Sequence, residues 1–475
     1  MGFTQITFLF AFLPISILIY LVTNKIFGLD TRISNAVLVC ENLLFFWWAE
    51  PKLLVFFIVL TILVYILGNK MYIAKEVKEK REWLICAIAI FIIVPVICKY
   101  MPELRYTSAD GQLATLPAFS DILVPLGISF FVLEAISYLA DIYTETTLPG
   151  SIMDVFLFMT LFPKAVSGPV VLWRDFRPQI HKRKTDINSV SSGLKRIIIG
   201  YAKKAIIADT FAESIILLNT KIMECTTDSA AVWLLAVLYF FRIYYDFSGY
   251  SEIAIGLCNI FGFDIGENFD QPYLAGSLTD FWRRWHISLG RWFREYIYIP
   301  LGGNRSGLLY VNIFITFIVA GLWHGWRITI LLWAVINGLI VIIEKMICNK
   351  EWYQKIPKRF RIIITVFIVC MGWLLFGASD MMTAGQIFKG LVISPGGNAP
   401  NFTWRFFMTA RITVFLVIAT AGAFGLLGRM ADFLKSKMNV TVYDILEKAM
   451  LLILFAVSII FVLGTSYTPF IYYSF

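Results

Sequence analysis

Apolar runs that contain few or no charged residues recur along the whole chain. A helix needs about 20 such residues to cross the hydrocarbon core of a bilayer. Runs without any charged residue include 308–326, 328–343, 362–379, 412–428 and 449–475. Further candidates lie at 5–22, 34–48, 53–68, 84–98, 122–140, 196–218 and 230–250. The pattern predicts eleven or twelve transmembrane helices, of which 34–48 is the weakest because it is short and contains Glu41.

One further apolar segment, at 155–172, is interrupted in a way that argues against a complete crossing. Pro163, Gly168 and Pro169 disfavour a continuous helix, and Lys164 would lie at mid-membrane, where a charge needs a polar lining. Non-helical backbone is tolerated at membrane depth only where protein or water surrounds it. The segment is therefore predicted to be re-entrant or parallel to the interface, shielded by other helices, and to enclose a cavity.

The composition agrees with a membrane protein and excludes a water-soluble one. Of 475 residues 59% are hydrophobic and only 15% are charged, and the mean hydropathy is +0.75. Soluble domains are about 25% charged, so the polar residues here are too few to cover soluble surfaces. The sequence predicts an all-α polytopic integral membrane protein, with one membrane-embedded domain over 1–475 and additional re-entrant or interfacial helices.

The net charge of +9 orients the chain rather than indicating nucleic acid binding. The basic residues lie in short clusters between the apolar runs, and loops rich in Lys and Arg stay in the cytoplasm. This rule places the N-terminus outside and puts the end of the run 308–326 at the outer face. The first run lacks a basic leader and a small-residue cleavage site, so we expect a retained helix rather than a signal peptide.

Three histidines offer the side chains that titrate near neutral pH without special tuning. His324, within Gly-Leu-Trp-His-Gly at 321–325, lies near the outer end of an uncharged run, which favours a catalytic role. The alternative is an interfacial histidine that anchors the helix beside tryptophans such as Trp323. His286 lies in the long loop 264–305 on the cytoplasmic side, and His181 is expected to be a solvated loop residue.

Two charged residues, Arg242 and Asp246, are embedded in the aromatic run 240–250. They are four positions apart, so a helix would bring them within pairing distance. A buried ion pair that fixes helix packing and a polar wall of a substrate tunnel are both consistent with this spacing.

A second constellation alternates arginines with tryptophans at 279–294. It contains Trp282, Trp285 and Trp292 together with Arg283, Arg284, Arg291 and Arg294. Read as one helix that Asp280 caps, it places Trp282 and His286 on one face. Such a basic amphipathic helix can bind lipid headgroups. Alternatively, its arginines bind the phosphates of an acyl donor, because guanidinium groups match phosphate oxygens.

Several kinds of site are not indicated by the sequence. The seven cysteines are scattered without metal-ligand spacing and are interpreted as small buried apolar residues, so no metal site is expected. The phosphate-binding, dinucleotide-binding, zinc-hydrolase and serine-hydrolase motifs are all absent. No internal repeat of the kind found in secondary transporters is evident either.

Several longer stretches resemble one known family. They are PLGISFFVLEAISYLADIY (125–143), FPKAVSGPVVLWRDFRPQ (162–179), YYDFSGYSEIAIGL (244–257), NFDQPYLAGSLTDFWRRWHISLGRWFREYIYIPLGGNR (268–305), AGLWHG (320–325) and the terminal PFIYYSF. Together they resemble the membrane-bound O-acyltransferase (MBOAT) family, in its bacterial branch for O-acetylation of polysaccharides such as alginate. The resemblance covers most of the chain.

The resemblance implies a ring of helices, thinned at its centre, with funnels from both faces that meet at a catalytic histidine. His324 matches that histidine and His286 matches a second one. Asp246, Arg242 and Trp323, with the residues of 279–294, would line the path of donor or acceptor. Relatives often carry a further histidine where this chain has Asn337, which cannot titrate.

The activity implied by the resemblance is transfer of an acetyl group from cytoplasmic acetyl-CoA, with no bound cofactor, for O-acetylation of an exported or cell-surface polysaccharide. The expected location is the bacterial cytoplasmic membrane. The acceptor would be a sugar hydroxyl or a serine of an extracytoplasmic SGNH-type partner. One alternative is D-alanyl transfer from a carrier protein to teichoic acid. Another is a glycan flippase or transporter that uses Arg242, Asp246 and Lys164.

Overall fold

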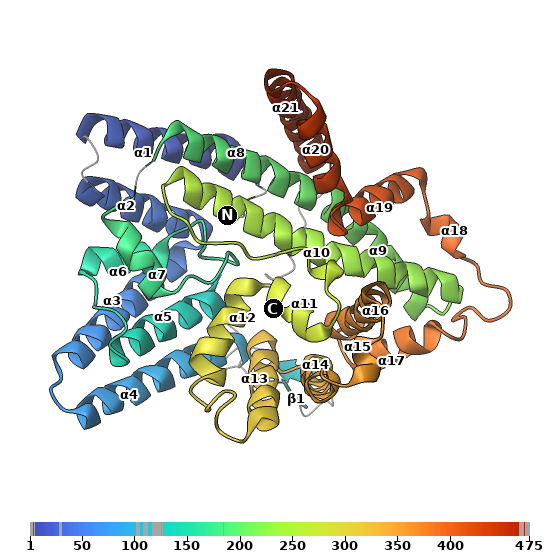
Figure 1. Ribbon diagram of the computed structural model, residues 1–475, viewed down its shortest axis with the longest axis horizontal. Coiled ribbons are helices and arrows are strands. Elements are labelled where there is room, and N and C mark those ends of the chain that lie inside the picture. The colour runs from blue at the N-terminus through green and yellow to red at the C-terminus, as the bar shows by residue number, and fades with distance from the viewer. Residues whose placement is uncertain are drawn as a thin grey trace. The chain divides into compact units, whose positions relative to one another are not determined.

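The structure is a computed structural model of the chain. It describes residues 5–27, 31–100, 127–183 and 185–464, together with residues 3, 105–107, 113–115, 125 and 470. Two compact units divide the chain, namely Met1–Leu194 with Ala254–Gly266 (unit 1) and Lys195–Ile253 with Glu267–Phe475 (unit 2). Two of the three unit boundaries fall inside helices, α8 (Ile187–Tyr201) and α10 (Ser229–Ile260) (Figure 1), and the third lies in the loop after α10.

Unit 1 is built from helices and one small hairpin. Its further α-helices are α1 (Leu13–Phe27), α2 (Thr31–Ala49), α3 (Pro51–Ile73), α4 (Val77–Pro95), α5 (Ile128–Tyr143), α6 (Ile152–Thr160) and α7 (Trp173–Ile180). The π-helical turns η1 (Phe8–Phe12) and η2 (Val96–Tyr100) extend α1 and α4. The strands β1 (Arg105–Thr107) and β2 (Leu113–Thr115) pair antiparallel, with Tyr106 opposite Ala114.

The regular elements of unit 2 in its described part are helices. After the π-helical η5 (Ala202–Ala208) its longer helices are α9 (Asp209–Met223), α13 (Leu309–His324), α14 (Ile328–Ile347), α16 (Lys358–Gly377), α19 (Ala410–Ala423), α20 (Leu426–Lys437) and α21 (Val440–Gly464). Shorter elements are η6 (Pro272–Leu274), α11 (Leu278–Arg284), α12 (Ile287–Phe293), η7 (Arg294–Tyr298), α15 (Glu351–Gln354), α17 (Met381–Gly390) and α18 (Trp404–Phe407).

Many of these helices are suited to a bilayer, which confirms an all-α polytopic membrane protein. Seven described helices are long and apolar enough to cross, at Phe8–Ile26, Pro51–Ile73, Val77–Lys99, Ser229–Ile260, Ile328–Ile347, Lys358–Gly377 and Val440–Gly464. The total of eleven or twelve remains a prediction. Several predicted runs form shorter helices, and the 16 residues of α13 extend about 24 Å, less than the ~30 Å of the hydrocarbon core.

The predicted single span at 412–428 is wrong in one respect. The chain bends by 70° between α19 and α20. Gly425, at the bend, has a φ of +71°, a backbone conformation that residues with a Cβ atom rarely adopt. The apolar run therefore does not continue as one helix. It is followed instead by α20, whose exposed Met430 and Phe433 alternate with basic residues.

As predicted, the interrupted segment at 155–172 does not form a spanning helix. Helix α6 has nine residues and begins with a capping box between Ser151 and Asp154, and residues 161–172 then turn without forming a helix. Lys164, almost fully buried, forms an ion pair with Glu134 of α5, and Glu134 also accepts a hydrogen bond from the Val171 N–H. The pair satisfies two charges that would otherwise be isolated in an apolar interior.

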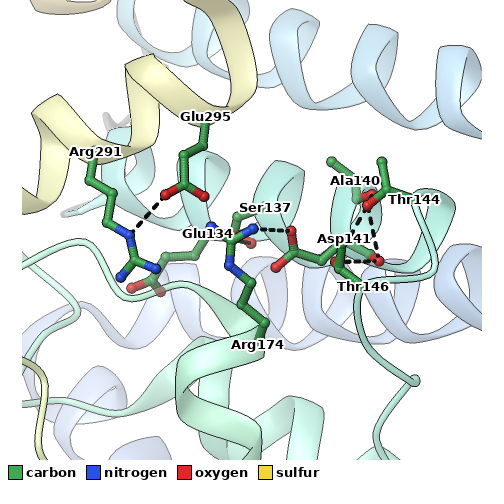
Figure 2. Close-up of polar contacts among 9 residues, drawn as sticks. All are labelled: Glu134, Ser137, Ala140, Asp141, Thr144, Thr146, Arg174, Arg291 and Glu295. Carbon is green, nitrogen blue, oxygen red and sulfur yellow. Dashed lines mark hydrogen bonds and ion pairs between the residues drawn. The ribbon is translucent and has the colours of Figure 1, made fainter. Parts of the chain in front are cut away.

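A second ion pair ties the same segment to α5 from its far end. Arg174 of α7 lies 3.7 Å from the Asp141 carboxylate, as Figure 2 shows. The turn between α6 and α7 is thus fixed at both ends to one helix of unit 1.

The prediction that the cysteines are buried apolar residues is only partly correct. All seven are free thiols, and Cys98 and Cys258 are buried. Cys40, Cys86 and Cys225 are exposed. Helices that face lipid leave apolar side chains exposed, so burial within the protein is not required of a small apolar residue there.

Removing one partner of the Glu134–Lys164 pair should destabilise the protein strongly, because the remaining charge would be buried alone. We expect Lys164→Ala to lower the free energy of unfolding by about 3–5 kcal/mol, and Glu134→Gln combined with Lys164→Met to cost less than Lys164→Ala alone. The thermal unfolding midpoint of the detergent-solubilised protein measures both effects.

The control for this comparison is Lys80→Ala, which removes the exposed ion pair with Glu145. Exposed pairs contribute little, so its midpoint should match that of the wild type. If Lys164→Ala also had the thermal midpoint of the wild type, the buried pair would not be what holds the segment in place.

Candidate active site

The two candidate histidines lie in one cavity of unit 2. His324 is the last residue of α13, and His286 lies at the break between α11 and α12. They share a small cavity of about 110 Å³ with a mostly aromatic wall. Its lining consists of Trp282, Trp285, His286, Leu289, Gly290, Phe293, Thr316, Phe317, Ala320, His324, Trp333, Trp373 and Phe376.

The position of His324 follows from the close packing of α13 against α14. The two helices are joined by the short loop 325–327 and run side by side (Figure 1). A side-chain carbon at Gly321 would lie 2.6 Å from the Ala334 Cβ, so this glycine allows the close approach. Because Gly321 is one turn before His324, the same contact sets the height and direction of the imidazole.

Aromatic rings surround the His324 imidazole. It packs edge-to-face against Trp323, Phe376 and Trp333, with ring centroids 4.7, 5.3 and 5.8 Å away. Only 6% of the residue is exposed. His324 therefore lies in an apolar environment, and this burial does not agree with the alternative of a headgroup anchor. Its catalytic role stays a prediction.

The amphipathic helix predicted at 279–294 is in fact two short helices. Helix α11 ends at Arg284, and His286 adopts a left-handed conformation with a φ of +47° before α12 begins. Non-glycine residues rarely take this conformation, and it recurs at functional sites. The break turns the chain so that both Trp282 and His286 reach the cavity.

The start of α11 also differs from the prediction that Asp280 caps it. Ser277 is the N-cap, and its hydroxyl accepts the Asp280 N–H. The carboxylate of Glu344, from the end of α14, accepts the N–H groups of Leu278 and Thr279 at 2.6 and 2.8 Å. A negative charge at a helix N-terminus is favourable, so Glu344 joins α11 to the helix that follows His324.

A buried amide determines which tautomer His286 adopts. The Ser288 N–H donates to the Asn268 Oδ1, which identifies that atom as the oxygen. The His286 Nδ1 lies 3.1 Å from the same oxygen, and the Asn268 Nδ2 donates to the Ser251 hydroxyl at 2.9 Å. Because an amide oxygen only accepts, Nδ1 carries the proton and Nε2 presents a lone pair. Asn268 opens the longest of the family-like stretches, but nothing in the sequence distinguishes it as a partner of His286.

Burial also keeps His286 neutral. The residue is 3% exposed, and the loss of solvation holds its pKa well below the usual value of 6.5, with a smaller contribution from the charge of His324.

The predicted arginines lie outside the cavity lining. Arg284 pairs with Asp280 at 3.0 Å and with Asp270 at 3.5 Å, and the Arg291 Nε donates to Glu295 at 3.0 Å (Figure 2). Arg283 is exposed and makes no ion pair with a residue that the structure describes. Of the predicted tryptophans, Trp282 and Trp285 line the cavity, whereas Trp323 contacts His324 from outside it.

The expected pairing of Arg242 with Asp246 is not what the structure shows. The Asp246 carboxylate forms an ion pair with the ammonium of the buried Lys204 of η5 at 2.7 Å, and the same ammonium lies 2.7 Å from the Asp209 carboxylate. None of these residues is among the described residues that line the cavity. Lys204 lies 42 residues before Asp246, and nothing in the sequence indicated that the two would pair. The pairing is set by the packing of helices and not by the four-residue spacing of Arg242 and Asp246.

Two further side chains are relevant to the chemistry of the cavity. The Trp282 indole N–H is buried and has no hydrogen-bond partner among the residues that the structure describes. Asn337, on α14, is buried and donates to the Trp333 carbonyl at 2.8 Å. Over the described ranges, no three His, Cys, Asp or Glu side chains are placed to hold a metal ion.

Comparisons with known proteins agree on one family. A model described as MBOAT, membrane-bound O-acyltransferase family, matches residues 43–383. The probable alginate O-acetylase of Pseudomonas putida is 32% identical, with all of both chains covered. The peptidoglycan O-acetyltransferase of Helicobacter pylori is 29% identical over 81% of this chain and 78% of its own length. The teichoic acid D-alanyltransferase of Bacillus subtilis is 26% identical over 64% of this chain and 80% of its own length.

The low pKa of His286 predicts how stability should change with pH. Below about pH 6.5 the unfolded chain binds a proton at this histidine that the folded chain does not, so stability falls as the pH decreases. Above pH 6.5 both states are neutral there and the contribution is constant. We expect the thermal midpoint of the wild type to fall more between pH 7.5 and 5.5 than that of His286→Asn. Equal falls in the two proteins would contradict a neutral, buried His286.

Proposed function

The chain belongs to the membrane-bound O-acyltransferase family, and we propose that it transfers an acetyl group from cytoplasmic acetyl-CoA, across the membrane, for O-acetylation of an exported or cell-surface polysaccharide. The family and the named relatives establish a multi-pass membrane O-acyltransferase. The donor, the direction of transfer, the catalytic base and a location in the bacterial cytoplasmic membrane belong to the proposal.

The observation that carries this proposal is the pair of imidazoles in one buried, aromatic cavity. His324 is supplied by a helix too short for a full crossing, and His286 by a broken helix that enters from the preceding long loop. Exclusion of water from such a cavity protects a thioester from hydrolysis and strengthens electrostatic interactions within it.

We assign the role of general base to His324. Its imidazole accepts the proton of the attacking hydroxyl while that oxygen bonds to the thioester carbonyl carbon. When the tetrahedral intermediate collapses, the carbon–sulfur bond breaks and the imidazolium returns the proton to the leaving thiolate. General base catalysis contributes typically ~10²–10⁴-fold to the rate.

The Trp282 indole is the proposed donor to the oxyanion that forms during this attack. Its N–H is buried beside the cavity and is not used by any residue that the structure describes. A preorganised donor in a water-excluded site stabilises developing negative charge without reorganisation.

His286 is proposed to hold the donor rather than to exchange protons with it. Its Nδ1–H is used by Asn268, and its Nε2 lone pair can accept an amide N–H of the donor's pantetheine arm. Of the arginines, Arg283 is the best candidate for the donor's phosphates, since Arg284 and Arg291 are already paired with carboxylates.

The alternatives have less support. D-alanyl transfer matches a relative at 26% identity over 64% of the chain, compared with 32% over the whole chain for an alginate relative. A flippase would use Lys164 and Asp246 to line a path, but these charges are paired with Glu134 and Lys204. The proposal includes two acceptors, namely a sugar hydroxyl or a serine of an extracytoplasmic SGNH-type partner that completes the transfer.

Replacing His324 tests the proposed base. His324→Ala should reduce acetyl transfer in membrane vesicles by at least ~10²-fold, since general base catalysis would be lost. His324→Gln keeps a hydrogen-bonding side chain without a titrating one and should be equally impaired. The matched control is His181→Ala, which removes a half-exposed histidine that pairs with Asp154. Normal transfer by a folded His324→Ala protein would refute the mechanism.

Replacing Asn268 tests the role of the His286 tautomer. Asn268→Leu removes the acceptor for the Nδ1–H and should lower the rate by roughly 10–100-fold, as loss of an orienting outer partner does at other histidine sites. Asn268→Asp retains an acceptor and should recover part of this loss. Ser251→Ala, which leaves the Asn268 oxygen in place, serves as the control. Equal rates for Asn268→Leu and Asn268→Asp would show that Asn268 acts only by packing.

A further inference from the structure

A second and much larger cavity of unit 2 also lies at the end of α16. Its volume is about 580 Å³, within the range of about 300–1,000 Å³ typical of ligand pockets. Helices α9, α10, α16 and α17 enclose it. The lining residues are Asn219, Thr220, Met223, Glu224, Leu235, Tyr239, Leu374, Gly377, Ala378, Ser379, Thr383 and Ile387.

This cavity is adjacent to the loop that follows His324. Phe376, whose ring lies 5.3 Å from the His324 ring, directly precedes Gly377 and Ala378 of the cavity lining. The Ala378 carbonyl accepts hydrogen bonds from the Thr329 hydroxyl at 3.2 Å and from Arg327 at 3.5 Å. In the orientation derived from the basic loops, this end of α16 faces outward, on the side where the acceptor must arrive.

Two polar groups of the cavity lack partners within the described part of the chain. The Asn219 Oδ1 is buried without a hydrogen-bond donor. The Tyr239 hydroxyl makes no hydrogen bond to a described residue, and Gly377 leaves room for it, since a Cβ there would overlap the hydroxyl. Burying the Asn219 oxygen unsatisfied is costly, and the Tyr239 hydroxyl can bond a ligand, so a ligand with hydroxyl groups is favoured over an acyl chain, which has none.

The charge of the cavity further limits the class of ligand that it can bind. Among the described lining residues, Glu224 is the one acidic or basic side chain, and it pairs with Lys221 at 2.7 Å. No arginine or lysine among the lining residues is left to bind a carboxylate. A uronate polymer such as alginate carries a carboxylate on every ring, and such groups need cationic partners when they are removed from water.

We propose that this cavity binds uncharged sugar units of the acceptor glycan and presents one of their hydroxyl groups toward His324. The inference rests on the proposed acyl transfer. Its ligand class differs from the alginate named for several relatives. Asn219 and Tyr239 would hydrogen-bond the sugar hydroxyls, while Leu235, Leu374 and the Tyr239 ring would contact the apolar faces of the rings.

Binding of oligosaccharides by the purified full chain tests this directly. The probe is a panel of immobilised neutral, N-acetylated and uronate oligosaccharides, presented without any acyl donor. We expect binding to be confined to uncharged members. Thr220→Trp, which fills the cavity from α9, should weaken it by at least 10-fold, whereas Ile216→Trp, on a 63% exposed position one turn earlier, should not.

Two milder variants distinguish the loss of a hydrogen bond to the sugar from the filling of the cavity. Tyr239→Phe and Asn219→Leu each remove one hydrogen-bonding group and should each weaken binding by up to about 10-fold. Tyr310→Phe, at an exposed tyrosine of α13, is the control for Tyr239→Phe. Three outcomes would each overturn the proposal. They are that the protein binds no member of the panel, that it binds uronate and neutral oligosaccharides equally well, and that Thr220→Trp leaves the binding intact. A lipid that co-purifies with the wild type and is lost from Thr220→Trp would assign the cavity to lipid and refute it too.

The binding assay is independent of catalysis, so the two proposals can fail separately. His324→Ala should bind the neutral oligosaccharides as the wild type does, because it does not alter this lining. Glycan binding by a chain that transfers no acetyl group would refute the proposed function alone. Acetyl transfer that Thr220→Trp does not slow, together with absent glycan binding, would refute only the acceptor site.

Discussion

A polar side chain inside a membrane protein must find its partner within the protein, because surrounding lipid offers none. This constraint accounts for the buried polar contacts described above. Lys164 is paired with Glu134, Lys204 with Asp246, and His286 with Asn268. Buried groups that lack a partner within the described chain are therefore informative. The Trp282 N–H adjoins the cavity of the two histidines, and the Asn219 oxygen lies in the larger cavity beside it.

The sequence predicted most of the helices, since they leave local signals, and it singled out His324, which lines the smaller cavity. Uncharged runs marked the spans, and Pro163 with Gly168 marked a segment that does not cross. Pairings over long distances in the chain left no such signal. The spacing of Arg242 and Asp246 suggested a pair, but Lys204 of another helix takes that place. The helical period at 279–294 could not reveal the left-handed residue at His286 or the capping by Ser277.

The arginine-rich stretch shows why composition overstates a binding site. Its charges suggested a phosphate cradle, yet two of its arginines neutralise carboxylates of the same stretch. The break in the helix, rather than the charge, is what brings this stretch to the cavity. Asn268 was missed for a related reason, because an asparagine that orients a neighbouring imidazole looks like any loop asparagine until the fold places it 3.1 Å from the ring.

The tight wall around the two imidazoles has a consequence for the acyl group itself. A volume of about 110 Å³ is well below the range of about 300–1,000 Å³ that is typical of ligand pockets. In the proposed acyl transfer, such a cavity would favour a short acyl group over a fatty acyl chain. The bulk of Trp285, Trp333 and Phe376 would thus act as a gauge of chain length, selecting a short acyl group by lack of room rather than by any contact that recognises it.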